Sequence, residues 1–324
     1  MKAALCKSLD GPDAIVIEEL PDPVAGPGQV VVRVRAAALN FLDTLVVHGR
    51  YQYKPPLPFS PASEFAGVIE SLGPGVSGWS VGDRVMGYMQ MGAAREKIAV
   101  PAQGLVRIAA NVADPIAAGI TVTYATALHG LKDRGQIKAG DTVAVLGAAG
   151  GAGLAAVELA KLLGARVIAV ASSDAKLAVC RDHGADEGFN YATGELKQGL
   201  RDLTGGNGCD IVYDCVGGAH TEAALRAIAW GGRLLVIGFA AGDIPKIPIN
   251  LLLLKNASLV GVFWGEHARR DPAAHVANMN VLMDWVAAGK LKPHVHKTYP
   301  LAETAAAIRE LGERRAAGKV IITP

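Results

Sequence analysis

Cysteine is scarce in this chain of 324 residues. Its four cysteines, Cys6, Cys180, Cys209 and Cys215, are scattered and form no C-x-x-C pair. A small number of cysteines without paired spacing argues against a disulfide framework. We therefore expect a protein that folds in a reducing compartment, and the cytoplasm fits best.

An excess of charge of one sign is also lacking. The 32 lysines and arginines nearly balance 30 acidic residues, which leaves a net charge of +2. Without a basic run, a nucleic-acid partner is not expected. The charged N-terminal residues do not form a signal peptide, and the long uncharged run between Asp141 and Glu158 is too short to cross a bilayer. We expect no membrane association.

Motifs for a catalytic metal or nucleophile are missing as well. The eight histidines form no H-E-x-x-H motif and no cluster with cysteine, and no G-x-S-x-G is present. His48, His129, His183 and His220 are each isolated in the sequence and are expected to be structural or solvated. The chemistry must then come mainly from a cofactor that the protein orients. Hydride transfer from a nicotinamide suits that arrangement.

A glycine cluster is the most informative feature that is present. Residues 141–153 read DTVAVLGAAGGAG and lead into an alanine- and leucine-rich helical stretch. A strand, a glycine turn and a helix N-terminus together are typical of a pyrophosphate site. Ala148 replaces the first glycine of G-x-G-x-x-G, while Gly150 and Gly153 fill the other two places. An ordinary glycine-rich turn in an α/β protein is the alternative.

The pattern of apolar residues changes along the chain. The first third is typical of short strands punctuated by glycine and proline, at residues 14–19, 29–35, 68–71 and 84–86. A helical pattern follows at residues 117–131. The chain length allows two domains with full cores.

From residue 142 onward, strands and helices alternate. This rhythm predicts a parallel sheet covered on both faces. The final strand, residues 319–322, is too short to stand alone and is expected to return to the N-terminal β-domain. The expected strands are residues 142–146, 166–171, 210–215, 233–237 and 258–262, and the expected helices are residues 174–182, 195–203, 220–229, 275–288 and 303–315.

The end of the second alternating strand indicates which dinucleotide is bound. An NAD site usually carries a carboxylate there, about 20 residues after the first glycine. Here the strand ends in Ala171, Ser172 and Ser173, and Asp174 fits a helix N-terminus better. Ser172 and Lys176 could bind and neutralise a 2′-phosphate, which favours NADPH. The alternative is that Lys176 is a solvated helix lysine.

Several longer motifs resemble one family over the whole chain. They are ALNFLDTLVVHGRY at residues 38–51, PFSPASEFAGVIESLGPGV at 58–76, VGDRV at 81–85, GAAGGAG at 147–153, DIVYDCVGG at 210–218 and GGRLLVIGF at 231–239. The chain resembles the zinc-independent medium-chain dehydrogenase/reductases, in the quinone oxidoreductase branch that includes zeta-crystallin. Zinc-bearing relatives have a cysteine near Asn40 and G-H-E where this chain has Ala62, Ser63 and Glu64, so no metal is expected.

The resemblance implies a fold and a set of domains. The fold is α/β, with a GroES-like β-rich catalytic domain and a Rossmann doubly wound parallel sheet. The catalytic domain would span residues 1–118 and return at residues 266–324, and the NADPH-binding domain would span residues 119–265. Relatives pair through the edge of the cofactor sheet, so a homodimer through residues 258–262 is expected.

The resemblance also implies site residues. Asn40, Asp43 and Tyr51 would face the nicotinamide end and carry catalysis, although Tyr51 could instead pack on loop prolines. Thr126 would lie against the nicotinamide, unless it merely bonds its own helix. Further cofactor-binding residues would be Ala149, Gly150, Gly151, Ala152 and Gly153 at the pyrophosphate, Ser172, Lys176, Tyr191 and Arg314 at the 2′-phosphate, Val216 and His220 at the adenosine, and Gly238, Phe239, Val262, Phe263 and Trp264 at the nicotinamide ribose and amide.

Three functions stay open at this point. The first is an NADPH-dependent quinone reductase that transfers hydride to a quinone or related conjugated carbonyl without a metal. The second is an enoyl reductase for an α,β-unsaturated thioester or ketone. The third is a crystallin-like protein that binds NADPH without turnover.

Overall fold

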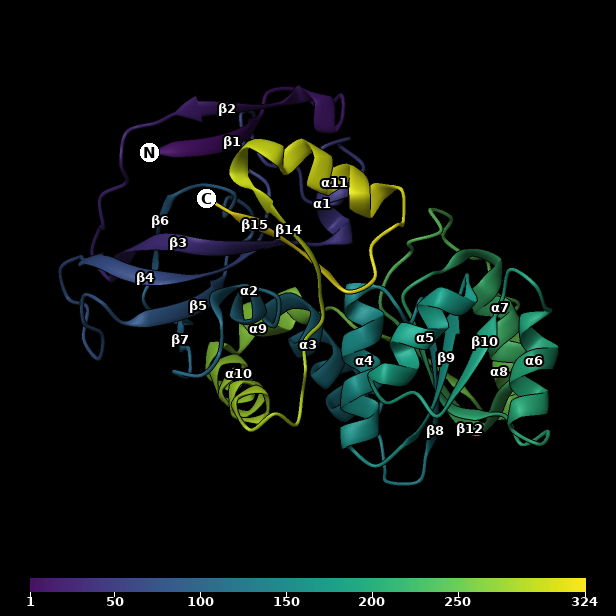
Figure 1. Ribbon diagram of the computed structural model, residues 1–324. Coiled ribbons are helices and arrows are strands. Elements are labelled where there is room, and N and C mark those ends of the chain that lie inside the picture. Colours follow the sequence, from purple (N-terminus) through teal and green to yellow (C-terminus); the bar gives the residue numbers. More distant parts are fainter. The chain divides into compact units, whose positions relative to one another are not determined.

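The computed structural model describes residues 1–324 and divides them into two compact units (Figure 1). The first, the catalytic unit, contains residues 1–122, 268–289 and 293–324. The second, the nucleotide unit, contains residues 123–267 and 290–292. The domain limits expected from the sequence stay a prediction.

The nucleotide unit is built on six parallel strands in the order β10-β9-β8-β11-β12-β13. In chain order this is 3-2-1-4-5-6, the strand order of the Rossmann fold, which confirms the predicted fold. The strands are β8 (Thr142–Leu146), β9 (Arg166–Ala171), β10 (Glu187–Asn190), β11 (Cys209–Asp214), β12 (Ile228–Val236) and β13 (Ser258–Gly261).

Helices cover both faces of this sheet because its central strands are apolar on both sides. In β8 and β9, every residue after the first is buried. One face packs on α6, α7 and α8 through residues such as Leu200, Leu225 and Leu252. The helices of the unit are α3 (Thr121–Leu128), the π-helical turn η2 (His129–Arg134), α4 (Gly151–Leu162), α5 (Asp174–Asp182), α6 (Leu196–Leu203), α7 (Gly218–Arg226), α8 (Asn250–Lys255) and α9 (Trp264–Arg270), which runs into the catalytic unit.

Two details of the sequence prediction are wrong here. The helix expected at residues 220–229 ends at Arg226, and Ile228 already begins β12, where its buried side chain belongs to the core beside α7. The helix expected at residues 117–131 is broken at Gly119, which separates α2 (Asp114–Ala118) from α3. Strand β10, which has no strong alternation of apolar residues, was not expected at all.

The catalytic unit is built on a curved, mostly antiparallel sheet in the order β14-β15-β3-β4-β5-β7, with β6 paired to β3. The C-terminal strand β15 pairs with β3, which confirms the predicted return of the last strand to the N-terminal β-rich domain. The strands are β1 (Lys2–Cys6), β2 (Ile15–Glu19), β3 (Gln29–Leu39), β4 (Glu64–Leu72), β5 (Arg84–Tyr88), β6 (Lys97–Pro101), β7 (Val106–Arg107), β14 (Val295–Pro300) and β15 (Lys319–Thr323).

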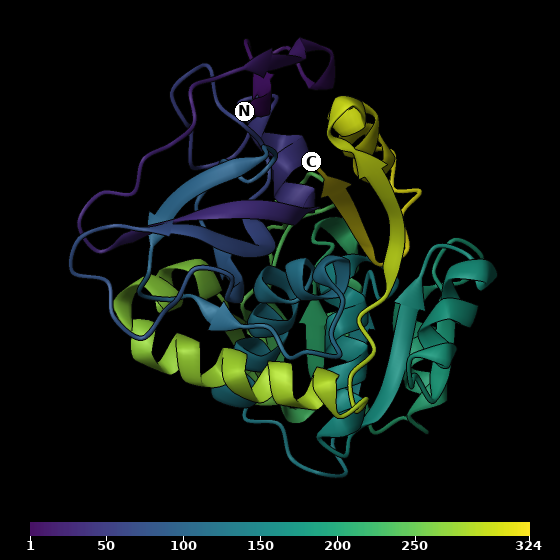
Figure 2. The same cartoon turned by 60° about the vertical axis from the view of Figure 1, so that its left-hand side comes forward.

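Two helices of this unit lie side by side. In both views α11 (Thr304–Gly312) lies along β15, and it also contacts α1 (Phe41–Val46) (Figures 1 and 2). The longest helix, α10 (Pro272–Ala287), contacts β7, and two short 3-10 turns, η1 (Pro12–Ala14) and η3 (Leu301–Glu303), complete the unit. Helix α1 begins directly after the end of β3 and packs against α11, which lies near the C-terminus of the chain.

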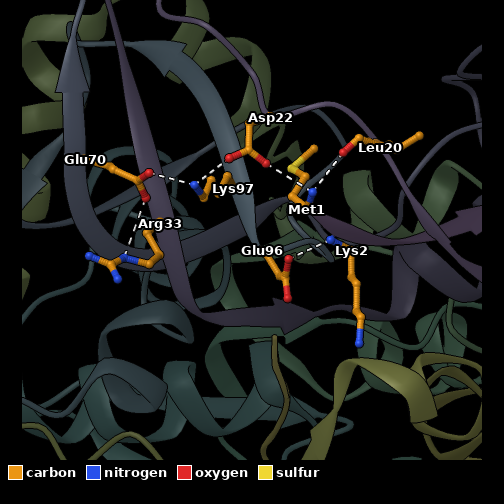
Figure 3. Close-up of polar contacts among 8 residues, drawn as sticks. All are labelled: Met1, Lys2, Leu20, Asp22, Arg33, Glu70, Glu96 and Lys97. Atoms are coloured by element: carbon orange, nitrogen blue, oxygen red, sulfur yellow. Dashed lines mark hydrogen bonds and ion pairs between the residues drawn. The ribbon is translucent and has the colours of Figure 1, made fainter.

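A chain of surface ion pairs ties β1 to the main sheet (Figure 3). Lys97 bridges Asp22 at 2.6 Å and Glu70 at 2.7 Å, and Glu70 lies 3.7 Å from Arg33. The Met1 amine is 3.1 Å from the Asp22 carboxylate. Hydrogen bonds to Lys97 and the N-terminus hold the pKa of Asp22 below its usual value. Exposed pairs of this kind orient the strands more than they stabilise them.

Candidate functional site

The glycine turn lies at the carboxyl edge of the parallel sheet, between β8 and α4. Gly147 has a φ of +70°, which favours glycine. A Cβ on Gly153 would lie 2.2 Å from the Gly147 carbonyl oxygen, so that position admits only glycine. The N-cap of α4, Gly150, makes no side-chain cap, and the first turn of α4 carries no acidic residue. The N-terminal N–H groups of α4 therefore suit an anion.

The turn also sits where the order of the strands reverses. A Cβ on Gly147 would lie 3.0 Å from Val216 Cγ2, so the loops after β8 and β11 touch. Buried Asp214 fixes the second loop by accepting from the backbone N–H groups of Val216 and Gly217 and from the Thr221 hydroxyl, at 2.8, 3.0 and 2.5 Å. In open α/β sheets such a switch point is where ligands bind.

The residues expected at a 2′-phosphate gather around the end of β9. Lys176 Nζ donates to Ser172 Oγ at 3.4 Å. Ser173 caps α5 by accepting from the backbone N–H of Lys176. Asp174 is in the first turn of α5 and accepts from Asn190 at 3.0 Å, so its carboxylate is engaged by the next strand. The end of β9 therefore presents hydroxyl and ammonium groups.

Other predicted cofactor residues line the same sheet edge. The rings of Tyr191 and His220 contact each other at 4.6 Å between centroids, which joins the ends of β10 and β11. The segment after β12 runs beside the β11 loop, because Ala240 and Ala241 donate to the Cys215 and Val216 carbonyls. This segment places a partly exposed Phe239 next to Gly217 and Gly238 near the Cys215 carbonyl.

The remaining predicted residues are more dispersed. Val262 and Trp264 are largely buried behind β13, whereas Phe263 is 62% exposed. Thr126 is half-buried on α3. Arg314 belongs to the catalytic unit, where it follows α11 with a φ of +57°. Its place in the 2′-phosphate pocket stays a prediction.

In the catalytic unit, Asn40 and Asp43 organise the start of α1. Asp43 accepts from the backbone N–H groups of Asn40 at 2.8 Å and Ala62 at 2.9 Å. Ala62 has a φ of +65°, which is strained for a residue with a Cβ, and the second of these bonds holds it in place. Burial raises the pKa of Asp43 to about 6, against the opposing effect of these two hydrogen bonds.

A buried ammonium group lies beside Asn40. Lys319 Nζ donates to Asn40 Oδ1 and Glu64 Oε1, both at 2.6 Å, and to the Leu39 carbonyl at 3.0 Å. Asn40 Nδ2 in turn donates to Glu64 Oε1 at 2.9 Å, and the backbone N–H of Val122 donates to Glu64 Oε2 at 2.7 Å. Lys319 is 3% exposed and Glu64 is 0% exposed. Both polar ends of the Asn40 amide are therefore held in one orientation.

Three tyrosines border this cluster. Burial, and then the nearby Asp43 charge, raise the pKa of Tyr51. Burial raises the pKa of Tyr88 to about 12, with smaller effects from Tyr51, Glu64 and Tyr53. The Tyr51 and Tyr88 phenols therefore stay protonated near neutral pH and can donate hydrogen bonds to an oxygen acceptor.

Sequence reasoning missed part of this cluster. Lys319 and Glu64 are 255 residues apart in the chain, so no local pattern could pair them. Tyr53 and Tyr88 also lie outside the motifs of the sequence. The only signals in the sequence were the isolated Lys319 at the start of the last strand and Glu64, which follows Ala62 and Ser63.

Comparison with known proteins gives the family. Residues 26–110 match the alcohol dehydrogenase GroES-like domain, and residues 151–279 match the model described as zinc-binding dehydrogenase. Quinone oxidoreductase-like protein 2 from Rattus norvegicus is 38% identical over 323 residues, which cover 99% of this chain and 92% of the relative. The chain belongs to the quinone oxidoreductase branch of the medium-chain dehydrogenase/reductases.

Two further similarities bear on function. The structure of Escherichia coli quinone oxidoreductase complexed with NADPH has a TM-score of 0.93 and 25% identity, with all of both chains covered. A mycocerosic acid synthase-like polyketide synthase from Mycobacterium tuberculosis is 35% identical over 92% of this chain, which matches 14% of that much longer protein. As a member of this family, the chain is an oxidoreductase.

None of the helices of this chain has the length and apolar character needed to span a membrane.

Proposed function

We propose that this protein is an NADPH-dependent quinone reductase that acts on a quinone or related conjugated carbonyl. The main support for this proposal is that the glycine turn between β8 and α4 lies at the switch point, on the same sheet edge as Ser172 and Lys176 at the end of β9. The quinone oxidoreductase-like relative supports the substrate class, and the NADPH complex of the Escherichia coli protein supports the cofactor.

The residues present fit NADPH. Residues 149–153 would hold the pyrophosphate through backbone N–H groups, and Ser172 with Lys176 would bind the 2′-phosphate. Tyr191 would also border the 2′-phosphate, and Val216 and His220 would border the adenosine. Gly238, Phe239 and the segment 262–264 would line the nicotinamide ribose and amide. When bound, NADPH supplies a hydride.

The catalytic unit would orient the acceptor and meet the charge that develops on its oxygen. We assign that role to Tyr51 as hydrogen-bond donor, with Asn40 as the second polar group, because the Asn40 amide is held in place by Lys319 and Glu64. The proton would come from water or from the Tyr51 hydroxyl. Asp43 has no exposed surface, so its role is proposed as positioning α1 and Ala62 rather than touching the acceptor.

We propose that the reaction needs no zinc. At the places where zinc-bearing relatives have cysteine and histidine, this chain has Asn40 and Ser63, and the Lys319 ammonium is already bonded to Asn40 and Glu64. An ammonium in this position satisfies Glu64 electrostatically and repels a second cation.

A cytoplasmic homodimer is the form that we propose for this enzyme. The edge strand β13 exposes Leu259, and the neighbouring helix α8 exposes Leu253 and Leu254 at 81% and 65%. An unpaired strand edge beside apolar side chains suits pairing with a second copy. Sedimentation velocity would show a 67 kDa species, twice the chain mass of 33.5 kDa, and a monomer at micromolar concentration would contradict it.

The polyketide synthase similarity favours one second candidate, an enoyl reductase. The deciding experiment mixes purified protein and NADPH with 1,4-benzoquinone, 9,10-phenanthrenequinone or crotonyl-CoA and follows the loss of NADPH absorbance. Faster oxidation with the quinones supports the proposal, whereas preference for crotonyl-CoA assigns the second candidate. NADPH binding without oxidation by any acceptor would assign a crystallin-like binding role instead.

A further inference from the structure

Three metal-ligand side chains meet in the nucleotide unit, outside the site described above. His129 and Asp133 lie one helical turn apart on η2, and His267 comes from α9. One ligand atom from each side chain lies within 4.8 Å of the others. His129 Nδ1 is 2.8 Å from Asp133 Oδ2, and the rings of His129 and His267 stack at 4.1 Å. His129 is isolated from other histidines in the sequence, but the fold stacks His267 on it.

One atom of this cluster lacks a partner. The Nε2 atom of His267 is buried and makes no hydrogen bond. Leaving a buried polar atom without a partner is unfavourable, so native structures rarely do so. The stacked neighbour cannot satisfy it, because ring nitrogens bind in the plane of the ring and not through its face. A neutral imidazole nitrogen that makes no hydrogen bond can serve as a metal ligand, so His267 Nε2 is available for that role.

We propose that His129, Asp133 and His267 bind one divalent transition-metal ion, with Zn²⁺ as the best fit. Two imidazoles and one carboxylate, plus a water, make a four-coordinate zinc shell. The i, i+4 spacing of His129 and Asp133 places both ligands on one face of η2, and His267 approaches from a different element.

The metal would add a link between η2 and α9, close to an existing contact between η2 and the end of β13. Gly130 on η2 already packs near Val262, and Arg134 donates to the Gly261 carbonyl at 3.1 Å, so η2 and the end of β13 are in contact. A shared ion requires the two stacked rings to tilt toward a common point and the His129–Asp133 bond to open slightly. Binding would hold the start of α9, and with it Phe263 and Trp264, against η2. The role is structural, and it is tested by metal binding without reference to the proposed reductase activity.

Cobalt is the probe for the test, because Co²⁺ takes zinc sites and is coloured. The full-length chain, free of any histidine tag and treated with chelator, is titrated with CoCl₂ while visible absorption is recorded. We expect a d–d band that saturates at one Co²⁺ per chain, disappears when one equivalent of Zn²⁺ is added, and accompanies a higher thermal unfolding midpoint.

Variants locate the ion. His267→Gln and Asp133→Asn should each weaken Co²⁺ binding at least tenfold, and Asp133 is exposed, so its variant should fold even if the histidine variant does not. Asp182→Asn on α5 and His48→Gln in the catalytic unit are matched exposed controls and should bind as the unmodified chain does. Absence of a saturable band, or equal binding by Asp133→Asn and the controls, would overturn the proposal.

Discussion

At the level of single residues, the buried Lys319 side chain connects the C-terminal strand of the catalytic unit to the start of α1. Its ammonium binds three acceptors, and its stem packs against Gly119, where a Cβ would come within 3.1 Å. Removing one partner of a buried ion pair leaves the other charge unpaired, which costs more than the pair itself contributes. The C-terminal strand is therefore fastened to the start of α1 through this one side chain.

The first prediction concerns that pair. Lys319→Met should lower the free energy of unfolding by about 3–5 kcal/mol, because Glu64 then stays buried without its counter-charge. The double variant Lys319→Met/Glu64→Gln should recover part of the loss. Urea unfolding followed by circular dichroism measures both, and a loss below about 1 kcal/mol in the single variant would refute the account of Lys319.

The second prediction is a pH dependence from Asp43. Its folded pKa of about 6 lies above the unfolded value of 3.8, so the folded chain binds this proton more tightly. The stability that the protonated carboxyl contributes is complete below pH 3.8 and is lost as the pH rises through about 6. The stability of the unmodified chain minus that of Asp43→Asn should therefore fall between pH 4 and 6.5 and then level off. A difference that rises over this range would show that the sign is wrong.

Residue contacts were the part of the site that the sequence could least predict. The local features could be predicted: Asp174 was placed at a helix N-terminus, and Ser172 and Lys176 were paired, because each lies within a few residues of a strand end. Glu64, Lys319 and His267 could not be predicted, because their partners come from distant segments that only the folded sheet brings together.

At the scale of elements, the strand–turn–helix unit formed by β8 and α4 positions the proposed cofactor site. Its strand, Thr142–Leu146, was predicted with its full bounds because a short apolar run between a charged residue and a glycine cluster has few alternatives. Strands β10 and β14 were not predicted, since their half-exposed residues carry little apolar signal.

The third prediction tests the glycine turn. Gly153→Ala places a Cβ 2.2 Å from the Gly147 carbonyl and 2.8 Å from Ala148 Cα, so the backbone must shift. We expect a loss of about 1–3 kcal/mol in stability and at least tenfold weaker NADPH binding by fluorescence titration. Gly150→Ala is the matched control for folding, because its Cβ approaches only one atom, at 3.4 Å, and φ is −72°. Its stability should change by less than about 1 kcal/mol. Equal loss of stability in the two variants would contradict the steric account.

At the scale of the whole molecule, the sequence predicted the architecture better than the contacts. The alternation of strands and helices predicted a parallel sheet, and its strand order in the structure is that of the Rossmann fold. The return of the last strand to the β-rich unit was also predicted correctly. These features follow from apolar patterns repeated over many residues, which single exceptions such as Gly119 do not disturb.

We propose that a phosphorylated nicotinamide nucleotide binds at the switch point and reduces a quinone. The most direct measurement compares NADPH with NADH as reductant for 1,4-benzoquinone, using the unmodified chain, Lys176→Ala and, as a control on α6, Lys197→Ala. We expect turnover with a lower KM for NADPH than for NADH. This preference should fall about tenfold or more in Lys176→Ala and stay unchanged in Lys197→Ala. No turnover with either nucleotide, or an NADPH preference that Lys176→Ala leaves intact, would contradict it.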